Sequence, residues 1–276
     1  MRRRWVLNVA VVLVALALAG VAWLDYQRPA DEWRLTDLAP DDVHVVSVQY
    51  GDGTRLVIER DHAGWRISEP VTARASHFHV EQLLRLTRAP SEHRYDSTEL
   101  DPQELGLIPP KIKLTFNGTA VGLGDTDAVD GLRYAMVGER VHLIPDALTP
   151  LIAGPWWNFL DRHILEQHDE PVALTTPVLA MRLRDGDWVI QRGELAQRRG
   201  DAFMADWAGV EALMARPLDS PPETEPDVRV ELAGGGHRRF AATQEDGEVR
   251  LVDLDSGVAY VLSQELRHYL LTGEER

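Results

Sequence analysis

Apolar side chains fill positions 5–24 almost without interruption, and Asn8 is the one polar residue among them. Twenty helical residues rise about 30 Å, which matches the hydrocarbon core of a bilayer. Three arginines at 2–4 precede the run, so the positive-inside rule places the N-terminus in the cytoplasm. The pattern predicts a cytoplasmic tail at 1–4, one transmembrane helix at 5–24, and a single-pass inner-membrane protein whose C-terminal part lies in the periplasm.

A cleaved signal peptide is the alternative for this segment, because the small residues at 15–19 offer sites for a signal peptidase. The apolar part of a signal peptide runs about 7–15 residues. Here the apolar run continues through 20–24, which favours the membrane anchor. Residues 25–42 contain prolines and scattered charges without an apolar period, and are expected to form a juxtamembrane linker.

Beyond residue 43 the pattern changes between the period of a strand and the period of a helix. Alternating stretches such as 43–50 and 112–116 are bounded by glycine-rich turns, which predicts antiparallel strands. Ser76 precedes apolar residues spaced i, i+3, i+4 and i+7 from Val80, which predicts a capped helix. We therefore expect an α+β fold, with antiparallel β-rich units and short helices behind the transmembrane helix.

The same order of patterns occurs twice along the chain. Four patterns of the first half have counterparts in the second, in the same order: 64–67 and 186–190, 80–84 and 210–214, 110–114 and 226–230, 142–148 and 260–266. A second amphipathic helix is expected over 203–214. Repeated order along a chain indicates duplication. We predict two related α+β units, at 43–170 and 171–276.

Composition limits the partners that such units bind. The chain has 276 residues and a net charge of −15, with 44% hydrophobic residues, which is typical of a folded globular protein. An acidic surface repels nucleic acid, so no nucleic-acid partner is expected. Cysteine is absent, which excludes disulfides and thiolate zinc sites.

Several short motifs of the first half follow one another in an order known from one family. They are Gly64 to Ile67 with Pro70, the helical pattern at 80–86, Leu105-Gly106-Leu107 before Pro110, Leu123-Gly124, the strands within 133–144, and the segment 159–165. This ordered set resembles the bacterial family that carries the domain of unknown function DUF4340. The resemblance covers about 43–165 and extends only weakly into the second half. It implies a membrane-tethered exported protein, often encoded beside gliding-type ABC exporter components, without an established activity or agreed catalytic residues.

Signatures of known catalytic and metal sites are missing. The chain has no cysteine, no Gly-x-Ser-x-Gly and no Ser-x-x-Lys motif. The loop 124–131 carries three aspartates, but their spacing does not fit a calcium loop, so a solvated turn is favoured. His77 and His79 point apart on a helix and have no third ligand nearby in the sequence. The glycines at 234–236 are expected to form a hairpin turn. We expect no catalytic residue, metal or cofactor.

The aromatic cluster of Trp156, Trp157 and Phe159 is the strongest candidate for a binding site. Exposed rings of this kind provide a platform for a sugar or a partner protein. Alternatively, the three rings pack the junction between the two units, and this interpretation is favoured.

Three functions are compatible with these observations. The first is a non-enzymatic accessory protein that binds a partner in an ABC-type exporter or cell-envelope complex. The second is a binding module for a glycan or another envelope ligand, and the third is an envelope hydrolase with unrecognised carboxylates. The missing signatures and the family resemblance favour the first.

Overall fold

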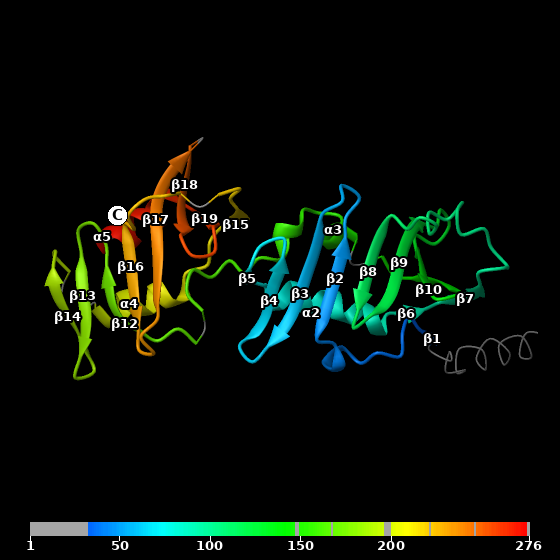
Figure 1. The fold of residues 1–276 in the computed structure, drawn as a ribbon, viewed down its shortest axis with the longest axis horizontal. Coiled ribbons are helices and arrows are strands. Elements are labelled where there is room, and N and C mark those ends of the chain that lie inside the picture. The colour runs from blue at the N-terminus through cyan, green and yellow to red at the C-terminus, as the bar shows by residue number, and fades with distance from the viewer. Residues whose placement is uncertain are drawn as a thin grey trace, which may run out of the picture.

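Strands dominate the fold of this chain. The structure is a computed structural model, and it describes residues 33–146, 149–166, 168–195, 200–220, 222–245 and 247–274. Strands make up 44% of the described structure and helices 17%. The strands form two large sheets and one two-stranded sheet (Figure 1). The expected α+β class is therefore wrong, because the helical patterns form only short helices while most of the chain between them forms strands.

The prediction of a single-pass inner-membrane protein is also corrected. Within the described residues, no helix is both long and apolar enough to cross a membrane. The predicted tail at 1–4 and the predicted transmembrane helix at 5–24 lie outside the described residues, as does the first part, 25–32, of the predicted juxtamembrane linker at 25–42. A periplasmic location inferred from that helix has no support in the described part of the chain.

The first unit is a nine-stranded antiparallel sheet with helices on one face. Its strand order is β5-β4-β3-β2-β8-β9-β10-β11-β7. The strands are β2 Val45–Gln49, β3 Arg55–Asp61, β4 Gly64–Glu69, β5 Ala73–Arg74, β7 His93–Asp96, β8 Ile112–Phe116, β9 Thr119–Thr126, β10 Arg133–Val137 and β11 Arg140–Ile144. The helices are η1 Pro40–Asp42, α2 His77–Arg85, η2 Leu86–Arg88, α3 Thr149–Ile152 and η3 Trp156–Phe159, and a small sheet pairs β1 Trp33–Arg34 with β6 Pro90–Ser91.

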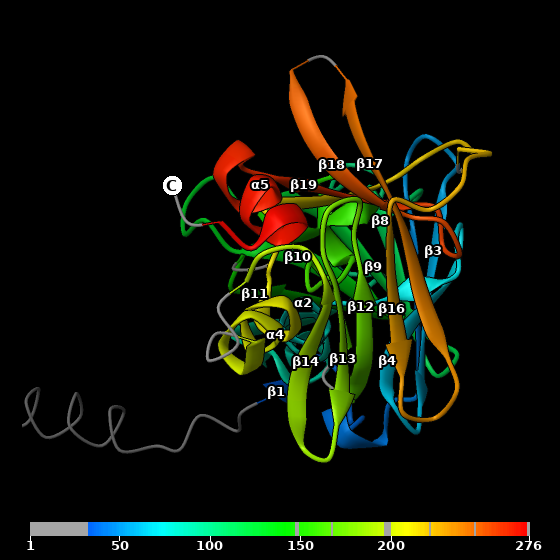
Figure 2. The same ribbon diagram turned by 90° about the vertical axis from the view of Figure 1, so that its left-hand side faces the viewer.

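The second unit repeats this arrangement with eight strands. Its order is β14-β13-β12-β16-β17-β18-β19-β15. The strands are β12 Pro171–Thr175, β13 Ala180–Arg184, β14 Asp187–Arg192, β15 Met214–Pro217, β16 Val228–Leu232, β17 His237–Glu245, β18 Glu248–Asp253 and β19 Val258–Leu262, with helices α4 Gly200–Gly209 and α5 Gln264–Thr272. If β5 is left out, the two sheets have the same strand order. In each unit the edge strand at the end of this order, β7 or β15, comes after the first helix of the unit in the sequence. Helices α4 and α5 lie on one side of the second sheet (Figure 2).

Turn and cap residues explain where several elements begin and end. Asn117 and Gly118 both have positive φ, as do Asp185 and Gly186, which suits the tight hairpins between β8 and β9 and between β13 and β14. Ser76 caps α2 by accepting a hydrogen bond from the backbone N–H of His79. The predicted second amphipathic helix, α4, ends at Gly209 and not near residue 214 as expected. The residues after it pair with the segment between the two units, 160–170, which we call the linker between the units, and then enter β15.

Each sheet buries one face against its helices. In the first unit, alternate residues of the central strands meet apolar residues of α2; the buried set includes Val46, Val48, Leu56, Ile58, Leu114, Phe116, Val80 and Leu83. In the second unit, Trp207 of α4 is fully buried and its indole N–H donates to the carbonyl of Leu270, 3.1 Å away. Buried apolar residues of both units belong to one continuous core.

A smaller apolar layer covers part of the opposite face of the first sheet. Val141 and Leu143 on β11 are buried but lie on the face away from the main core. The loop before β8 packs beside them, and Leu107 of this loop is fully buried. Gly122 and Gly124 of β9 let the loop approach, because a Cβ atom on Gly124 would lie 2.2 Å from the carbonyl oxygen of Leu105.

His142 is a titratable residue inside the first unit. Its ring nitrogen Nδ1 lies 3.0 Å from the hydroxyl of Ser91. Burial, together with Arg94 and Arg140, lowers the pKa of His142 to about 4 from an ordinary value near 6.5. Between these two pH values His142 is therefore protonated in the unfolded chain and neutral in the folded protein.

We expect the protein to lose stability as the pH falls from about 6.5 towards 4, because protonation of His142 favours the unfolded chain. Melting temperatures at pH values above and within this window measure the loss. The variant His142→Gln has no group that titrates at this position and should show a smaller loss. Equal losses in both proteins would assign the pH dependence to other groups, of which His79 is one, because burial lowers its pKa too.

Candidate functional site

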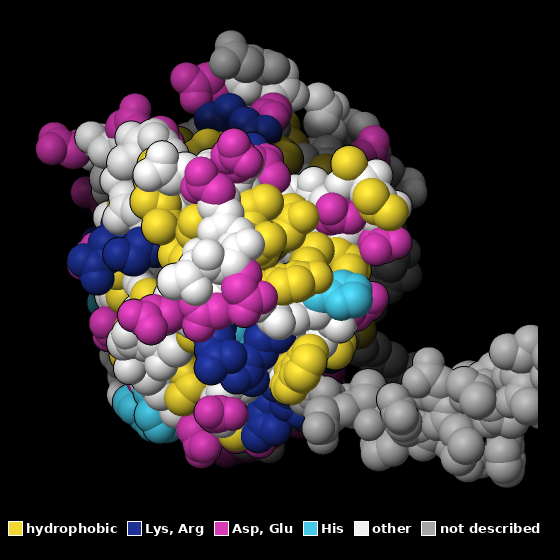
Figure 3. Space-filling view, turned by 90° about the vertical axis from the view of Figure 1, so that its right-hand side faces the viewer, with side chains coloured by type: hydrophobic (Ala, Val, Ile, Leu, Met, Phe, Trp, Pro, Cys, Tyr) yellow, Lys and Arg dark blue, Asp and Glu magenta, His cyan; other side chains and the backbone are white. Residues whose placement is uncertain are grey.

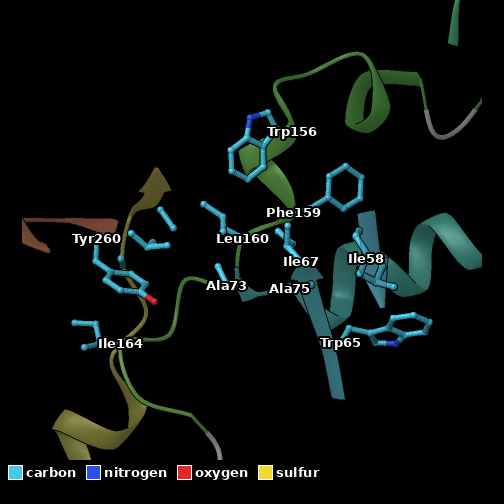
Figure 4. Packing of buried hydrophobic residues seen from close by; sticks show 14 of the residues in the cluster. Ile58, Trp65, Ile67, Ala73, Ala75, Trp156, Phe159, Leu160, Ile164 and Tyr260 are labelled. Carbon is cyan, nitrogen blue, oxygen red and sulfur yellow. The ribbon is translucent and has the colours of Figure 1, made fainter. Parts of the chain in front are cut away.

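The predicted aromatic platform lies at the junction between the two units. Phe159 is fully buried and Trp156 is 9% exposed, while Trp157 is half-buried. The Trp156 and Trp157 rings meet edge to face at 6.1 Å, and Phe159 meets the ring of His79 at 6.3 Å. Figure 4 shows Trp156 and Phe159 among the packed residues of this region. Two of the three rings therefore pack the core of the junction and do not offer a face to a ligand.

The chain that follows these rings joins the units through backbone hydrogen bonds. The N–H of Ser76 donates to the carbonyl of Phe159 at 2.7 Å, and the N–H of Asp161 donates to the carbonyl of Arg74. A few residues later, the N–H of Ile164 donates to the carbonyl of Val210. The segment 159–164 thus pairs first with the end of β5 and then with the residues before β15.

Arg74 is the central polar contact of the junction. Its side chain is only 17% exposed, and its guanidinium donates to the carbonyls of His163 and Leu165. It also lies 3.2 Å from Asp161 and 3.4 Å from the hydroxyl of Tyr260, a buried residue of the second unit that faces the first (Figure 4). Arg74 of the first unit therefore contacts both the linker between the units and Tyr260 of the second unit.

A network of charges surrounds Arg74. Glu166 of the linker lies 3.9 Å from both Arg74 and Arg66, and 2.6 Å from Arg238 of β17. Arg238 also forms a two-pronged pair with Asp169, with both distances 3.1 Å. Because every charge here has an opposite neighbour, the network is suited to fixing the two units and offers no free charge for a substrate.

The other predicted motifs have structural roles. Asp127 accepts hydrogen bonds from the N–H groups of Val129 and Asp130 and from the Tyr134 hydroxyl, which shapes the loop 124–131. His77 pairs with Glu81 on the exposed side of α2, at 3.0 Å. Within the described residues, no group of three or more His, Cys, Asp or Glu side chains is placed to hold a metal ion.

The arrangement closest to a catalytic pair is Asp161 with His163, whose Oδ1 and Nδ1 atoms lie 2.8 Å apart. The carboxylate also accepts the backbone N–H of His163, so the pair is part of a local turn. The ring of His163 forms no hydrogen bond to a serine or threonine hydroxyl in the described part of the chain. This geometry lacks the nucleophile that a hydrolytic triad requires.

A partly exposed apolar surface lies at the far end of the first unit. Tyr95 of β7 and Met136 of β10 flank the buried Val141, and His93 and Tyr134 flank Leu143 in the same way, as the strand register shows. Ile108, which is 50% exposed, follows Leu107 in the covering loop. We call His93, Tyr95, Ile108, Tyr134 and Met136 the end surface. Figure 3 faces this end and shows hydrophobic side chains gathered in its centre, with charged side chains around them.

The end surface adjoins an edge of the sheet that has no further strand among the described residues. β7 is the last strand in the order of the first sheet, and only β11 pairs with it. On the other side of β7, the Arg94 guanidinium lies over the Trp33 ring, at 5.9 Å, and Trp33 is 43% exposed. Apolar rings therefore flank this edge on both faces. The sequence did not reveal this surface, because its residues come from two separate strands, β7 and β10, and a loop.

Comparison of the chain with protein-family models, with curated proteins and with solved structures finds no match. The resemblance to DUF4340 therefore stays a prediction.

Proposed function

We propose that this protein is a non-enzymatic binding protein whose end surface takes up an extended segment of a partner protein. The observation that carries the proposal is the position of the end surface beside the free edge of β7. An added strand would hydrogen-bond to the backbone of β7, and its side chains would contact His93 and Tyr95 of β7 on one face and Trp33 on the other. Strand addition to an open edge is a common mode of peptide recognition.

The side chains beside this edge, and not its length, support the proposal. Long edge strands are normally protected by inward charges, prolines or a covering element. β7 has four residues, and its flanking rings are large and only partly exposed. Tyrosine and methionine are enriched at protein interfaces, and tyrosine brings a large contact area at little entropic cost.

The other two hypotheses have less support. A glycan platform requires exposed rings, whereas Trp156 and Phe159 are buried. A hydrolase requires a nucleophile or a matched pair of carboxylates, and the charged groups of the junction are paired with one another. From the family resemblance, subunits of an exporter or envelope complex are the first partners to look for.

A site-specific photo-crosslinker tests the proposal. The probe replaces Tyr95 in one protein and Val178 in a control, because Val178 is 51% exposed but belongs to the second unit. After irradiation in the source cells, we expect a heterologous protein linked to the Tyr95 probe and absent from the Val178 control. The same product should decrease about tenfold when His93→Glu is added, because His93 lies on β7 itself and a charge there would be buried at the contact.

Two results would overturn this function. One is the same set of products from both probe positions, which indicates random collisions. The other is a product formed only between two copies of this chain, which would assign the end surface to self-association. Circular dichroism of the His93→Glu protein distinguishes unfolding from loss of binding.

A further inference from the structure

The edge strand β7 carries an exposed cation, Arg94, in its middle. The guanidinium of Arg94 lies over the Trp33 ring, at 5.9 Å. In the part of the chain that the structure describes, no carboxylate lies within ion-pair distance of Arg94, and no acceptor takes a hydrogen bond from it. A guanidinium has five N–H donors in a planar fork. The Trp33 ring therefore packs against the guanidinium while the donors of Arg94 stay available.

The alternation of side chains along β7 determines what an added strand would meet. His93 and Tyr95 belong to the end surface, with their rings 6.3 Å apart, and Arg94 points to the opposite face, where Trp33 lies. In a strand added beside β7, the residue directly opposite Arg94 lies on the same face as Arg94. The two neighbours of that residue lie on the other face, beside His93 and Tyr95. One short segment therefore meets a cation between two rings.

The other charges beside β7 are engaged with one another. Asp96 lies on the same face as Arg94 and accepts hydrogen bonds from the N–H and the hydroxyl of Thr98. These hydrogen bonds, with a smaller contribution from Arg140, lower the pKa of Asp96. Arg140 of β11 lies opposite Asp96 in the strand register, so the two charges balance each other. Arg94 is then the cation of this edge that has no counter-charge among the described side chains.

The junction between the units shows how an arginine is satisfied at the corresponding place. In the second unit the position of His142 is taken by Tyr260, as the strand registers show. The arginine beside Tyr260 is Arg74, whose guanidinium lies 3.4 Å from the hydroxyl. The linker between the units supplies Asp161, whose carboxylate lies 3.2 Å from Arg74. The counter-charge at this place thus comes from a segment that hydrogen-bonds through its backbone to the units it joins.

We propose that the partner segment taken up at β7 carries an aspartate or glutamate opposite Arg94, with an apolar residue on each side of it. The carboxylate accepts hydrogen bonds from the guanidinium, and the two apolar side chains contact the end surface. The inference rests on the proposed function, because it names the chemistry of the segment that the end surface binds. The net charge of −15 repels an acidic segment at long range, so the local pair provides specificity and does not speed association.

Selection of random peptides displayed on phage, with the full chain as the target, tests this inference. The selected peptides are sorted by whether Tyr95→Ala abolishes their binding, since this variant removes a ring of the end surface without changing the charge. We expect the Tyr95-dependent peptides to be enriched in Asp or Glu between two apolar residues. In a synthetic peptide of this group, replacement of the acidic residue by its amide should weaken binding about fivefold.

Arg94→Gln distinguishes a direct pair from general electrostatics. With this variant the acidic peptide and its amide should bind equally. Arg182→Gln is the matched control, because it removes the same charge from an exposed side chain of the second unit. The control should keep the fivefold difference between the two peptides.

The outcomes separate this inference from the proposed function. If no selected peptide depends on Tyr95, both are wrong. If Tyr95-dependent peptides have no excess of acidic residues, or if Arg94→Gln keeps the difference between the acidic peptide and its amide, the inference is wrong and the proposed function stands. Melting temperatures show that each variant is folded, and His93→Ser replaces Tyr95→Ala if that protein does not fold.

Discussion

Replacement of Gly124 by alanine is expected to destabilise the first unit by about 3 kcal/mol. The new Cβ atom would lie 2.2 Å from the carbonyl oxygen of Leu105 and 3.0 Å from the side chain of Leu107. The first of these atoms is backbone, so the whole loop must move. Its movement breaks the hydrogen bond from the N–H of Asp125 to the Leu105 carbonyl, which is 2.8 Å long.

Urea unfolding measures this loss, with Gly209→Ala as the control. A Cβ atom on Gly209 would meet no heavy atom within 4 Å, and its φ is not in the left-handed region. The control should change the free energy of unfolding by less than about 1 kcal/mol, and in the stabilising direction. Similar stability of the two variants would show that the loop does not rest on β9.

Replacement of Arg74 by alanine is expected to separate the unfolding of the two units and to cost about 3 kcal/mol. The change leaves the carbonyls of His163 and Leu165 without their donor and leaves Asp161 without its closest cation. Differential scanning calorimetry should then show two transitions where the wild-type protein shows one. Limited proteolysis should cut the linker between the units faster.

Arg182→Ala is the matched control for Arg74→Ala. Arg182 also forms an ion pair, with Glu231 at 2.7 Å, but both side chains are well exposed, at 38% and 43%. Exposed ion pairs contribute at most about 1 kcal/mol, so this variant should keep one transition. If both arginine variants behaved alike, Arg74 would not be the residue that couples the units.

Local patterns in the sequence locate many elements but not their assembly. The hairpin at Asn117 and Gly118 and the cap at Ser76 are visible because a turn or cap depends on residues next to one another. The end of the second helix was placed too late, since Val210 has a helical spacing but its carbonyl accepts from Ile164 of the linker. Tertiary pairing here overrides a local preference.

The candidate sites were harder to find from the sequence. Tyr95, Met136 and Ile108 are far apart along the chain, and only the register of β7, β11 and β10 brings the first two together. By contrast, the conspicuous aromatic cluster at Trp156 and Phe159 is a packing feature. Conspicuous composition therefore indicated the core, and unremarkable residues form the surfaces proposed for binding.

The shared strand order has a consequence for how the chain acquires its fold during synthesis. In each unit the first strand pairs with one that comes after the helix: Val46 lies opposite Phe116, and Leu174 lies opposite Val230. Neither sheet is complete until nearly its whole unit has left the ribosome, and such distant pairing slows folding. The first unit holds all strands of its own sheet, so we expect it to fold while the second is still being translated. The nascent second unit then completes its sheet beside an already folded neighbour.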